Sequence, residues 1–446
     1  MQVVVIGGVA AGMSAAAKLK RNLKDGVDIV CYAKGGAVSY GACGLPFYVS
    51  DHIKTEAELV ERRPEQFAES GITVKVHHEV TGVDTAGKTV HVKNLDSGEE
   101  FDAPYDKLII GSGADVKKFP PFDRELDGLC QVRDVDDGNA VKSRLQAGGV
   151  TDVVIVGAGF IGLEMVEACK KYAPNVSVVE LAPRVLTPLD PEFSQRLEDE
   201  LVKNGVRVYT GAKVTDLECE NGKLTAAVVE KDGAKTSIPC QMVLNCAGIA
   251  PATGFIDGVE KAPNGAILVN EKMETSIPDV YAAGDCSVMK HFLTGQYTYT
   301  PLGTNANKQG RIIADVLGGK QPKPFALVGC TAMRLFGTDV AKVGLSEEDA
   351  ARAGLDFKTN TITGNSYASY YGKEKVVVKV VYDAKTRKIL GAQTCGQGIV
   401  VPRANYYAIA IRAGLTVDEF GFMDLCYSPP FGGVWDAAII ASNTAK

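Results

Sequence analysis

VVIVGAGFIG, at residues 153–162, decides the fold of this chain. Its four leading β-branched residues are typical of a buried parallel strand, and its glycines form a complete GxGxxG. A helical stretch follows, and the next strand, VSVVE, ends at Glu180, 18 residues past Gly162. An acid at this place holds the hydroxyls of an adenosine ribose. Strand, glycine turn, helix and acid together predict a unit that binds a dinucleotide.

The nicotinamide cofactor of this unit is predicted to be NADH. Glu180 favours NADH over NADPH, because the 2'-phosphate of NADPH would meet a carboxylate. Arg184 follows four residues later and is a cation of the kind that accepts a 2'-phosphate, so NADPH stays open.

A second copy of the pattern opens the chain. Residues 2–6, QVVVI, predict a strand, and glycines at 7, 8 and 12 precede a helix-prone stretch. The match is imperfect, because Val9 takes the place of the middle glycine. The next strand, 27–33, ends without an acid, at Ala33 and Lys34. We therefore expect either that other residues hold this ribose or that the adenosine end is bound loosely.

Two dinucleotide units about 150 residues apart suggest an electron relay in which a nicotinamide delivers hydride to a flavin. The 446 residues are 46% hydrophobic and 23% charged, ordinary values for a soluble protein of two to four domains. A net charge of -6 without a basic tract gives no reason to expect nucleic acid as a partner. The N-terminal apolar run is too short for a signal peptide or a membrane span, so we expect a cytoplasmic location.

Most of the 11 cysteines should be small core residues in a reducing compartment. None forms a CxxC pair, and no Cys/His cluster has zinc spacing, so no metal site is predicted. Cys31, Cys169, Cys246 and Cys286 all have apolar or small neighbours.

Cys43 has a different setting, SYGACGLPFYVS at residues 39–50. Its glycines and proline disfavour a long helix through Cys43, although a helix could begin just after it. We hypothesise a redox-active thiol beside a flavin, with a pKa lowered by the N-terminus of that helix or by the flavin. A buried structural cysteine is the alternative.

Further stretches fit a flavin site. YDKLIIGSGA, residues 105–114, predicts a strand ending in small residues that allow a ligand close to the backbone. TSIPDVYAAGD ends at Asp285, which is placed to accept a hydrogen bond from a cofactor hydroxyl, unless it is only a turn residue. The following PLGTNANKQGR begins a helix whose N-terminus could point at the flavin ring. Strand patterns then dominate from about residue 325 and predict a separate α+β domain.

With these motifs in this order, the chain resembles, over essentially its full length, the flavin- and pyridine-nucleotide-dependent disulfide reductases. The resemblance implies an α/β fold with two Rossmann-like dinucleotide-binding domains and a C-terminal α+β dimerisation domain. It implies an FAD-binding domain at 1–114 and 241–320, an NAD(P)H-binding domain at 115–240 and a dimerisation domain at 325–446. The cofactor-binding residues that it implies are Gly7, Gly8, Ala10, Ala11, Gly12, Lys34, Ser39, Val80, Ser112, Gly113, Gly157, Gly159, Phe160, Ile161, Gly162, Glu180, Gly248, Asp285, Gly303 and Thr304.

Two positions indicate the branch of the family. Dithiol members have a second cysteine where this chain has Tyr48, so it resembles the single-cysteine NADH oxidases, NADH peroxidases and coenzyme A-disulfide reductases. Ala10 stands where the peroxidases and many oxidases have a histidine, which weakens peroxide as the substrate. SYGACGLPFYVS is most like the coenzyme A-disulfide reductase segment.

The tail YSPPF resembles the YAPPF of those reductases, in which a tyrosine from the partner subunit of a homodimer reaches the active site. Tyr427 takes that place, and the branch's second tyrosine corresponds to Tyr370 or Tyr371. An interface aromatic is the alternative for Tyr427. Lys18 and Arg21, one turn apart on the first helix, could meet coenzyme A phosphates, or they form a solvated helix face.

The predicted activity passes electrons from NAD(P)H through FAD to Cys43 and on to a small-molecule disulfide or persulfide, such as coenzyme A disulfide. One alternative is an NADH oxidase in which Cys43 cycles through sulfenic acid. Another is a non-catalytic redox sensor that binds coenzyme A covalently at Cys43, although a complete NADH site is hard to explain in a passive binder.

Overall fold

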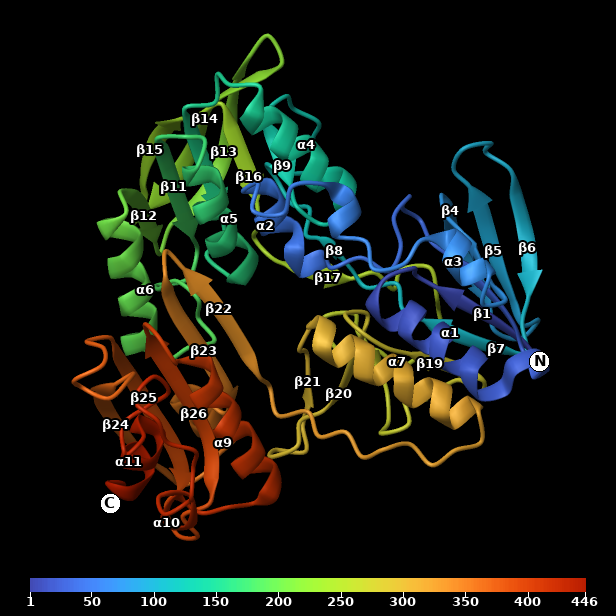
Figure 1. Ribbon diagram of the computed structural model, residues 1–446. Helices are drawn as coiled ribbons and strands as arrows, with labels where there is room; N and C mark the ends of the chain where they lie inside the picture. The colour runs from blue at the N-terminus through green and yellow to red at the C-terminus, as the bar shows by residue number, and fades with distance from the viewer.

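All 446 residues are described by a computed structural model. The first unit is built on a sheet of five parallel strands in the order β19-β7-β1-β2-β3. Helices α1 (Ala10–Leu23) and α7 (Gly303–Leu317) lie against each other on this unit (Figure 1). A side chain on Gly310 would collide with the carbonyl oxygen of Ala11, so glycine permits this close approach. The strands are β1 (Gln2–Ile6), β2 (Asp28–Tyr32), β3 (Ile72–Lys75), β7 (Lys107–Ile110) and β19 (Val280–Ala282).

The second unit repeats this architecture with five parallel strands in the order β12-β11-β10-β16-β9. Its apolar strands are buried on both faces, as expected for a parallel sheet covered by helices. The strands are β9 (Leu129–Gln131), β10 (Asp152–Val156), β11 (Asn175–Glu180), β12 (Val206–Thr210) and β16 (Met242–Asn245). Its helices are α4 (Val135–Gln146), α5 (Phe160–Lys170) and α6 (Pro191–Lys203).

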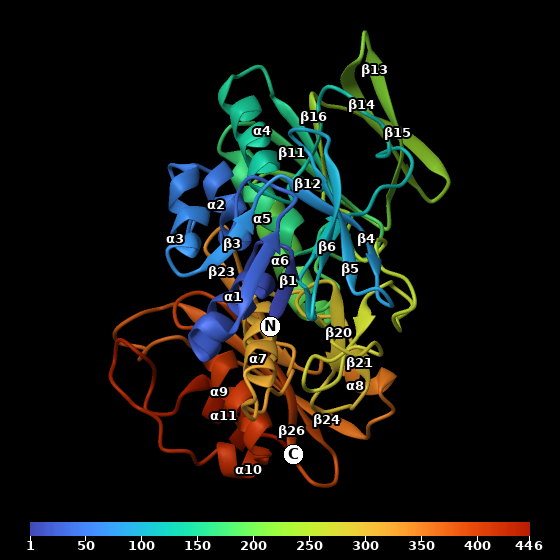
Figure 2. The same ribbon diagram turned by 90° about the vertical axis from the view of Figure 1, so that its right-hand side faces the viewer.

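Smaller antiparallel sheets extend both units. One, β4-β5-β6, belongs to the first unit, and β13-β14-β15 projects from the second (Figure 2). Strands β8 (Ala114–Val116) and β17 (Ile249–Pro251) pair where the chain crosses between the units. The other strands are β4 (His78–Asp84), β5 (Thr89–Asn94), β6 (Glu100–Pro104), β13 (Lys213–Glu220), β14 (Lys223–Lys231), β15 (Ala234–Pro239), β18 (Ile267–Leu268), β20 (Ser287–Lys290) and β21 (Tyr297–Thr298).

The C-terminal unit is an antiparallel sheet in the order β22-β23-β26-β25-β24, with helices packed on it. Its strands are β22 (Thr331–Leu335), β23 (Thr338–Gly344), β24 (Phe357–Asn365), β25 (Lys375–Asp383) and β26 (Ile389–Gly396). Its helices are α8 (Glu347–Arg352), α9 (Val401–Ala413), α10 (Val417–Phe420) and α11 (Ala437–Asn443).

The three bodies match the two dinucleotide units and the α+β domain expected from the sequence. The exact domain limits given above stay a prediction. None of the helices combines the length and apolarity needed to cross a bilayer.

One hydrophobic core joins parts that are far apart in the chain. It contains Leu45 and Val49 from short helix α2 (Leu45–Val49), Leu163 from α5 and Leu335 from β22. The Cys43 segment is therefore fixed on the second unit, where α2 packs against α4 and α5. Short helix α3 (Pro64–Ala68) follows this segment.

Candidate active site

Cys43 lies in a single 3-10 turn, Ala42–Gly44, which runs directly into α2. Its thiol is exposed and forms no disulfide, whereas Leu45 and Val49 are buried. The N–H of Ser39 donates to the carbonyl of Gly8, 2.8 Å away, and ties the segment to the first glycine loop. The expected break in regular structure is present, and the alternative of a buried structural cysteine is wrong.

Tyr48 is held as a structural residue. It is 8% exposed, and its hydroxyl donates to Asn139 Oδ1 of α4 over 2.7 Å. The ammonium of Lys142 lies 3.9 Å from the centre of its ring, a cation–π contact. A tyrosine in these contacts leaves Cys43 without a second thiol five residues away, and all 11 cysteines are free.

The protein's own groups raise the pKa of the Cys43 thiol, which corrects the expectation that α2 lowers it. Partial desolvation of the sulfur by neighbouring atoms is the largest cause, although Cys43 as a whole is exposed, and the negative charges of Glu164 and Asp285 follow. Helix α2 has only five residues, so its dipole is small. Lowering this pKa is therefore left to the bound cofactor or substrate.

The first glycine loop fits the pyrophosphate of a dinucleotide. A side chain on Gly12 would collide with the carbonyl oxygen of Gly7, so the loop can pack this closely only with glycine. Helix α1 begins at Ala10 without a side-chain cap, which leaves backbone N–H groups for an anion. Ala11 and Gly12 are buried in its first turn, and Gly8 packs against Val38 and Ala33.

A carboxylate lies beside the place where the first unit lacks its ribose acid. The N–H of His78 donates to the carbonyl of Ala33 over 2.9 Å, which brings β4 alongside the end of β2. Glu79, the next residue, forms an ion pair of 2.7 Å with Lys34. This pairing raises the pKa of Lys34. Glu79 is thus a candidate for the group that holds the FAD ribose, and Val80 beside it is buried.

Asp285 follows β19, close enough to Cys43 for its negative charge to raise the pKa of that thiol. Its carboxylate has no hydrogen-bond partner within the protein, and burial raises its pKa, with Arg133 opposing the shift. An unpartnered, partly buried carboxylate fits the polyol hydroxyls of FAD. Helix α7 starts nearby at Gly303 and Thr304 without a side-chain cap. The hydroxyl of Ser112 donates to the carbonyl of Ala252 over 2.7 Å, and Gly113 lies against the guanidinium of Arg133.

The second glycine loop has the same close packing between Gly162 and the carbonyl of Gly157. A side chain on Gly159 would meet no protein atom, so this glycine leaves room for a ligand. Phe160 and Ile161 begin α5, and Ile161 is exposed. Gly248, just before β17, has a φ of +111°.

Glu180 lies at the end of β11, as the fingerprint predicts. Its carboxylate accepts hydrogen bonds from the N–H groups of Ala158 and Ala182 over 2.6 and 2.7 Å. These bonds hold it against the glycine loop, where an adenosine ribose would lie. The residues present therefore fit NADH.

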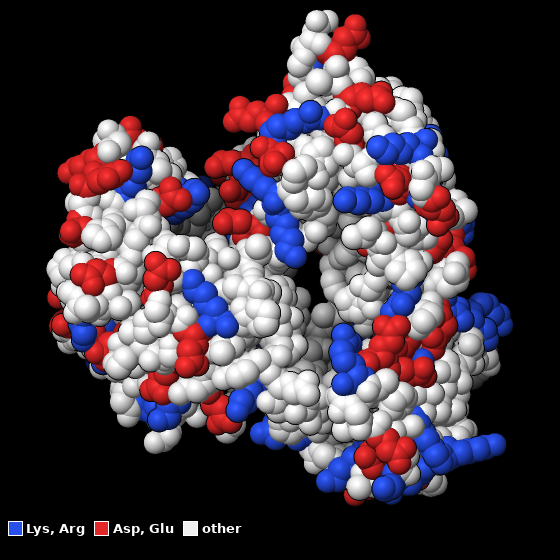
Figure 3. Space-filling view, turned by 180° about the vertical axis from the view of Figure 1, so that it is seen from behind, with Lys and Arg blue, Asp and Glu red and all other residues white.

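The predicted tyrosines gather in the C-terminal unit. Tyr370 and Tyr427 are 75% and 46% exposed, and their hydroxyls lie 2.9 Å apart. Both line a cavity of about 260 Å³ together with Trp435, and Tyr371 is also exposed. Within one chain these tyrosines lie in the C-terminal unit, away from α2 (Figure 1). A hollow lies between the first unit on one side and the second and C-terminal units on the other (Figure 3). The structure thus brings the tyrosines to each other and not to the Cys43 of their own chain.

Lys18 and Arg21 differ in their contacts. Lys18 forms an ion pair of 2.5 Å with Asp315 of α7, so its charge is already neutralised. Arg21 is exposed and has no ion-pair partner. Of the two, only Arg21 is free for a phosphate.

Glu164 was not identified from the sequence. It lies on α5 among buried apolar residues, and burial raises its pKa to about 7. An acid two residues after the last glycine of the fingerprint, inside GLEMV, is the signal that could have found it. Arg133 and Glu79 gave no comparable signal, because each depends on a tertiary contact.

Comparison with known proteins agrees with this site. Residues 1–310 match the family model of the pyridine nucleotide-disulphide oxidoreductases, and residues 332–439 match the model of their dimerisation domain. The chain is 32% identical to an NADH oxidase of Enterococcus faecalis, over all of this chain and 99% of that protein. It is also 32% identical to an NAD(P)H coenzyme A polysulfide/persulfide reductase of Pyrococcus horikoshii, over all of this chain and 98% of that protein.

A solved structure is similar over the whole chain. The NAD-dependent persulfide reductase from A. fulgidus superposes with a TM-score of 0.94 and 32% identity, covering 99% of this chain and 82% of the other. These matches confirm the fold class predicted from the motifs. The chain therefore belongs to the pyridine nucleotide-disulphide oxidoreductases, and it is an oxidoreductase that uses FAD and NAD(P)H.

Proposed function

We propose that the protein reduces the disulfide or persulfide of a small thiol such as coenzyme A, with Cys43 as the residue that bonds to the substrate sulfur. The observation that carries this proposal is the exposed Cys43, which has the buried Tyr48 in place of a second cysteine five residues further on. With no second thiol in the segment, the sulfur partner of Cys43 has to come from a substrate. A relative that reduces a coenzyme A polysulfide or persulfide supports this substrate class.

The Cys43 thiolate attacks one sulfur of RSSR, the S–S bond breaks, and RS⁻ leaves from a mixed disulfide. FAD, held by the N-termini of α1 and α7 and by Asp285, would supply the two electrons of NAD(P)H that break the mixed disulfide and return the Cys43 thiolate and a second thiol. The sum is RSSR + NAD(P)H + H⁺ → 2 RSH + NAD(P)⁺, and a persulfide gives RSH and H₂S. Desolvation, Glu164 and Asp285 raise the pKa of Cys43 and so favour the thiol. The reactive form is the thiolate, so the bound cofactor or substrate has to lower this pKa.

Binding of FAD is assigned to the chain's own polar groups. The N-termini of α1 and α7 offer N–H groups, and Asp285 accepts from a polyol hydroxyl. We assign the FAD ribose to Glu79 instead of the absent acid at Ala33. Arg21 is the cation left for a coenzyme A phosphate.

The functional molecule in this proposal is a cytoplasmic homodimer. Tyr427, paired with Tyr370, donates a proton to the departing thiolate in the partner's site. The exposed aromatic side chains of the C-terminal unit support this, since tyrosine and tryptophan are enriched at interfaces. Mixing C43S with Y427F subunits tests it, because each heterodimer then has one intact site. Activity no higher than that of either parent would contradict the shared site.

The activity test uses the purified yellow protein with NADH or NADPH. Coenzyme A disulfide, coenzyme A persulfide, hydrogen peroxide and oxygen are offered in turn. We expect turnover with a disulfide or persulfide that is lost in C43S. Full turnover of C43S with these substrates would refute the proposal.

An NADH oxidase is the second candidate, favoured by the similarity to the Enterococcus faecalis protein. In that case Cys43 would be oxidised to sulfenic acid and reduced again while oxygen is consumed. Rapid NADH oxidation in air without any added disulfide would identify this activity.

A further inference from the structure

The loop between β11 and α6 carries one basic residue, Arg184, in the sequence LAPRVLTPLD at 181–190. It directly follows Glu180, whose carboxylate is held by backbone N–H groups at the glycine loop. An arginine near this acid is what accepts the 2'-phosphate of NADPH in dinucleotide-binding folds. Where the Arg184 guanidinium lies therefore bears on the choice between NADH and NADPH.

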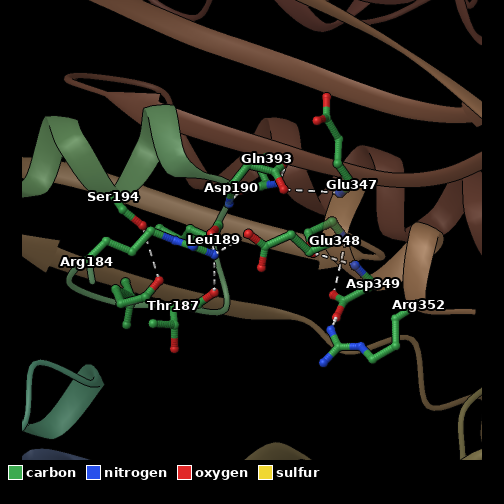
Figure 4. Close-up of polar contacts among 12 residues, drawn as sticks. Arg184, Thr187, Leu189, Asp190, Ser194, Glu347, Glu348, Asp349, Arg352 and Gln393 are labelled. Carbon is green, nitrogen blue, oxygen red and sulfur yellow. Dashed lines mark hydrogen bonds and ion pairs between the residues drawn. The ribbon is translucent and has the colours of Figure 1, made fainter. Parts of the chain in front are cut away.

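Arg184 is directed into the joint with the C-terminal unit (Figure 4). One terminal nitrogen donates to Glu348 Oε1 of α8 over 2.7 Å, and it lies 3.3 and 3.4 Å from the carbonyls of Thr187 and Leu189. The Arg184 side chain is 20% exposed, while that of Glu348 is 51% exposed. The charge of Arg184 is thus neutralised by a residue from another unit.

The same joint fixes α8 against the end of the loop (Figure 4). The buried Asp190 donates its N–H to Gln393 Oε1 over 2.9 Å and accepts from Gln393 Nε2 over 2.6 Å. Its carboxylate also accepts the N–H of Glu347, the first residue of α8, over 3.1 Å. Because Glu347 is anchored in this way, Glu348 is held next to Arg184 by the fold and not only by the ion pair.

We propose that Glu348 is a specificity-determining residue that withholds Arg184 from a 2'-phosphate and so favours NADH over NADPH. To reach the phosphate, Arg184 has to leave Glu348, which then stands unpaired near two added negative charges. Glu180 of the second unit and Glu348 of the C-terminal unit thus both favour NADH over NADPH. This inference rests on the NAD(P)H site and not on the identity of the sulfur acceptor.

The test compares binding of 5'-AMP and 2',5'-ADP to the intact flavoprotein by calorimetry. These probes differ only by the 2'-phosphate. In E348Q, the ratio of the two dissociation constants should shift toward 2',5'-ADP by about two- to fivefold. In R184Q the ratio should stay as in the wild type, because Arg184 is already occupied. The double variant R184Q/E348Q should lose the shift seen in E348Q.

R352Q is the matched control, since Arg352 is exposed on the same helix and pairs only with Asp349. It should leave the ratio unchanged, and E348D should restore most of the wild-type ratio. A loop that is merely loosened would weaken both probes together. The proposal is overturned by an unchanged ratio in E348Q, by an equal shift in R352Q, or by a shift that persists in R184Q/E348Q. Failure of every disulfide substrate would leave these binding results intact.

Discussion

Lys379→Met should break the joint between the second unit and the C-terminal unit. The Lys379 side chain is 3% exposed, and its ammonium lies 2.8, 2.6 and 2.8 Å from carboxylate oxygens of Asp190, Glu192 and Glu347. Removing one partner of a buried ion pair costs about 3–5 kcal/mol, because it leaves an uncompensated charge. In a cooperative unit of about 150–250 residues each kcal/mol lowers the melting temperature by about 2–4 °C. We therefore expect a loss of about 6–20 °C at pH 8.

The loss should be smaller at pH 5. Burial alone would lower the pKa of Lys379, but hydrogen bonds to Asp190, Glu192 and Glu347 outweigh it and raise the pKa. A raised lysine pKa gives stabilisation that is complete below the unfolded value and is lost only as pH rises through the folded value. The wild type thus keeps it from pH 5 to 8. Burial raises the pKa of Asp190, so in the variant this carboxyl takes up a proton as pH falls.

Thermal unfolding of the flavin-loaded protein, followed by circular dichroism at both pH values, measures this effect. Lys358→Met is the matched control, since Lys358 is exposed on the neighbouring strand and has no ion-pair partner. Adding Asp190→Asn to Lys379→Met should restore part of the loss, because it removes the most deeply buried charge. A melting temperature within 1–2 °C of the wild type at pH 8 would mean that the cluster is neutral to stability, and the reasoning would fail.

Four further outcomes are expected. C43S should keep its flavin spectrum and be reduced by NADH, but consume no NADH with disulfides; anaerobic spectra separate these steps. In E164Q, Cys43 should react with iodoacetamide at lower pH than in the wild type, because the negative charge of Glu164 raises the pKa of Cys43. The difference should be largest above pH 7, since Glu164 has a pKa of about 7 and is ionised there. E79Q should lose FAD more readily on dialysis than K93Q, a change on the neighbouring strand. Y48F should lower the free energy of unfolding, measured by denaturant titration, by about 1 kcal/mol and keep its turnover, because only the hydrogen bond to Asn139 is lost.

The glycine loops and their acid could be read from the sequence because each is a local pattern. The chain must turn sharply at Gly157 and pack closely at Gly162, and these demands fix residue types at fixed spacing. The same holds for the break at Cys43, where glycine and proline end regular structure. The two parallel sheets follow, since a strand, a glycine turn and a helix specify a crossover unit.

Contacts across units could not be predicted in this way. Lys34 gave no hint of Glu79, which is 45 residues away and meets it only because β4 folds back beside β2. Arg184 and Glu348 are 164 residues apart, and each is an ordinary surface residue in its local sequence. The raised pKa of Cys43 is also a tertiary effect, because it comes first from desolvation of the sulfur and then from Glu164 and Asp285, which lie in two other segments.

The C-terminal unit connects two requirements of the proposed reaction. Its α8 holds the loop that follows Glu180, while its Tyr370 and Tyr427 are exposed on a surface that a second subunit would use. Tyr48 stands where a second thiol would be and holds the Cys43 segment on α4 through Asn139 and Lys142. The ion pairs of Lys379 with Asp190 and Glu347 therefore join the end of the nucleotide loop to the unit that carries the tyrosines. Lys379→Met should accordingly weaken binding of 5'-AMP and, through the shared subunit surface, lower disulfide turnover as well, whereas Lys358→Met should change neither.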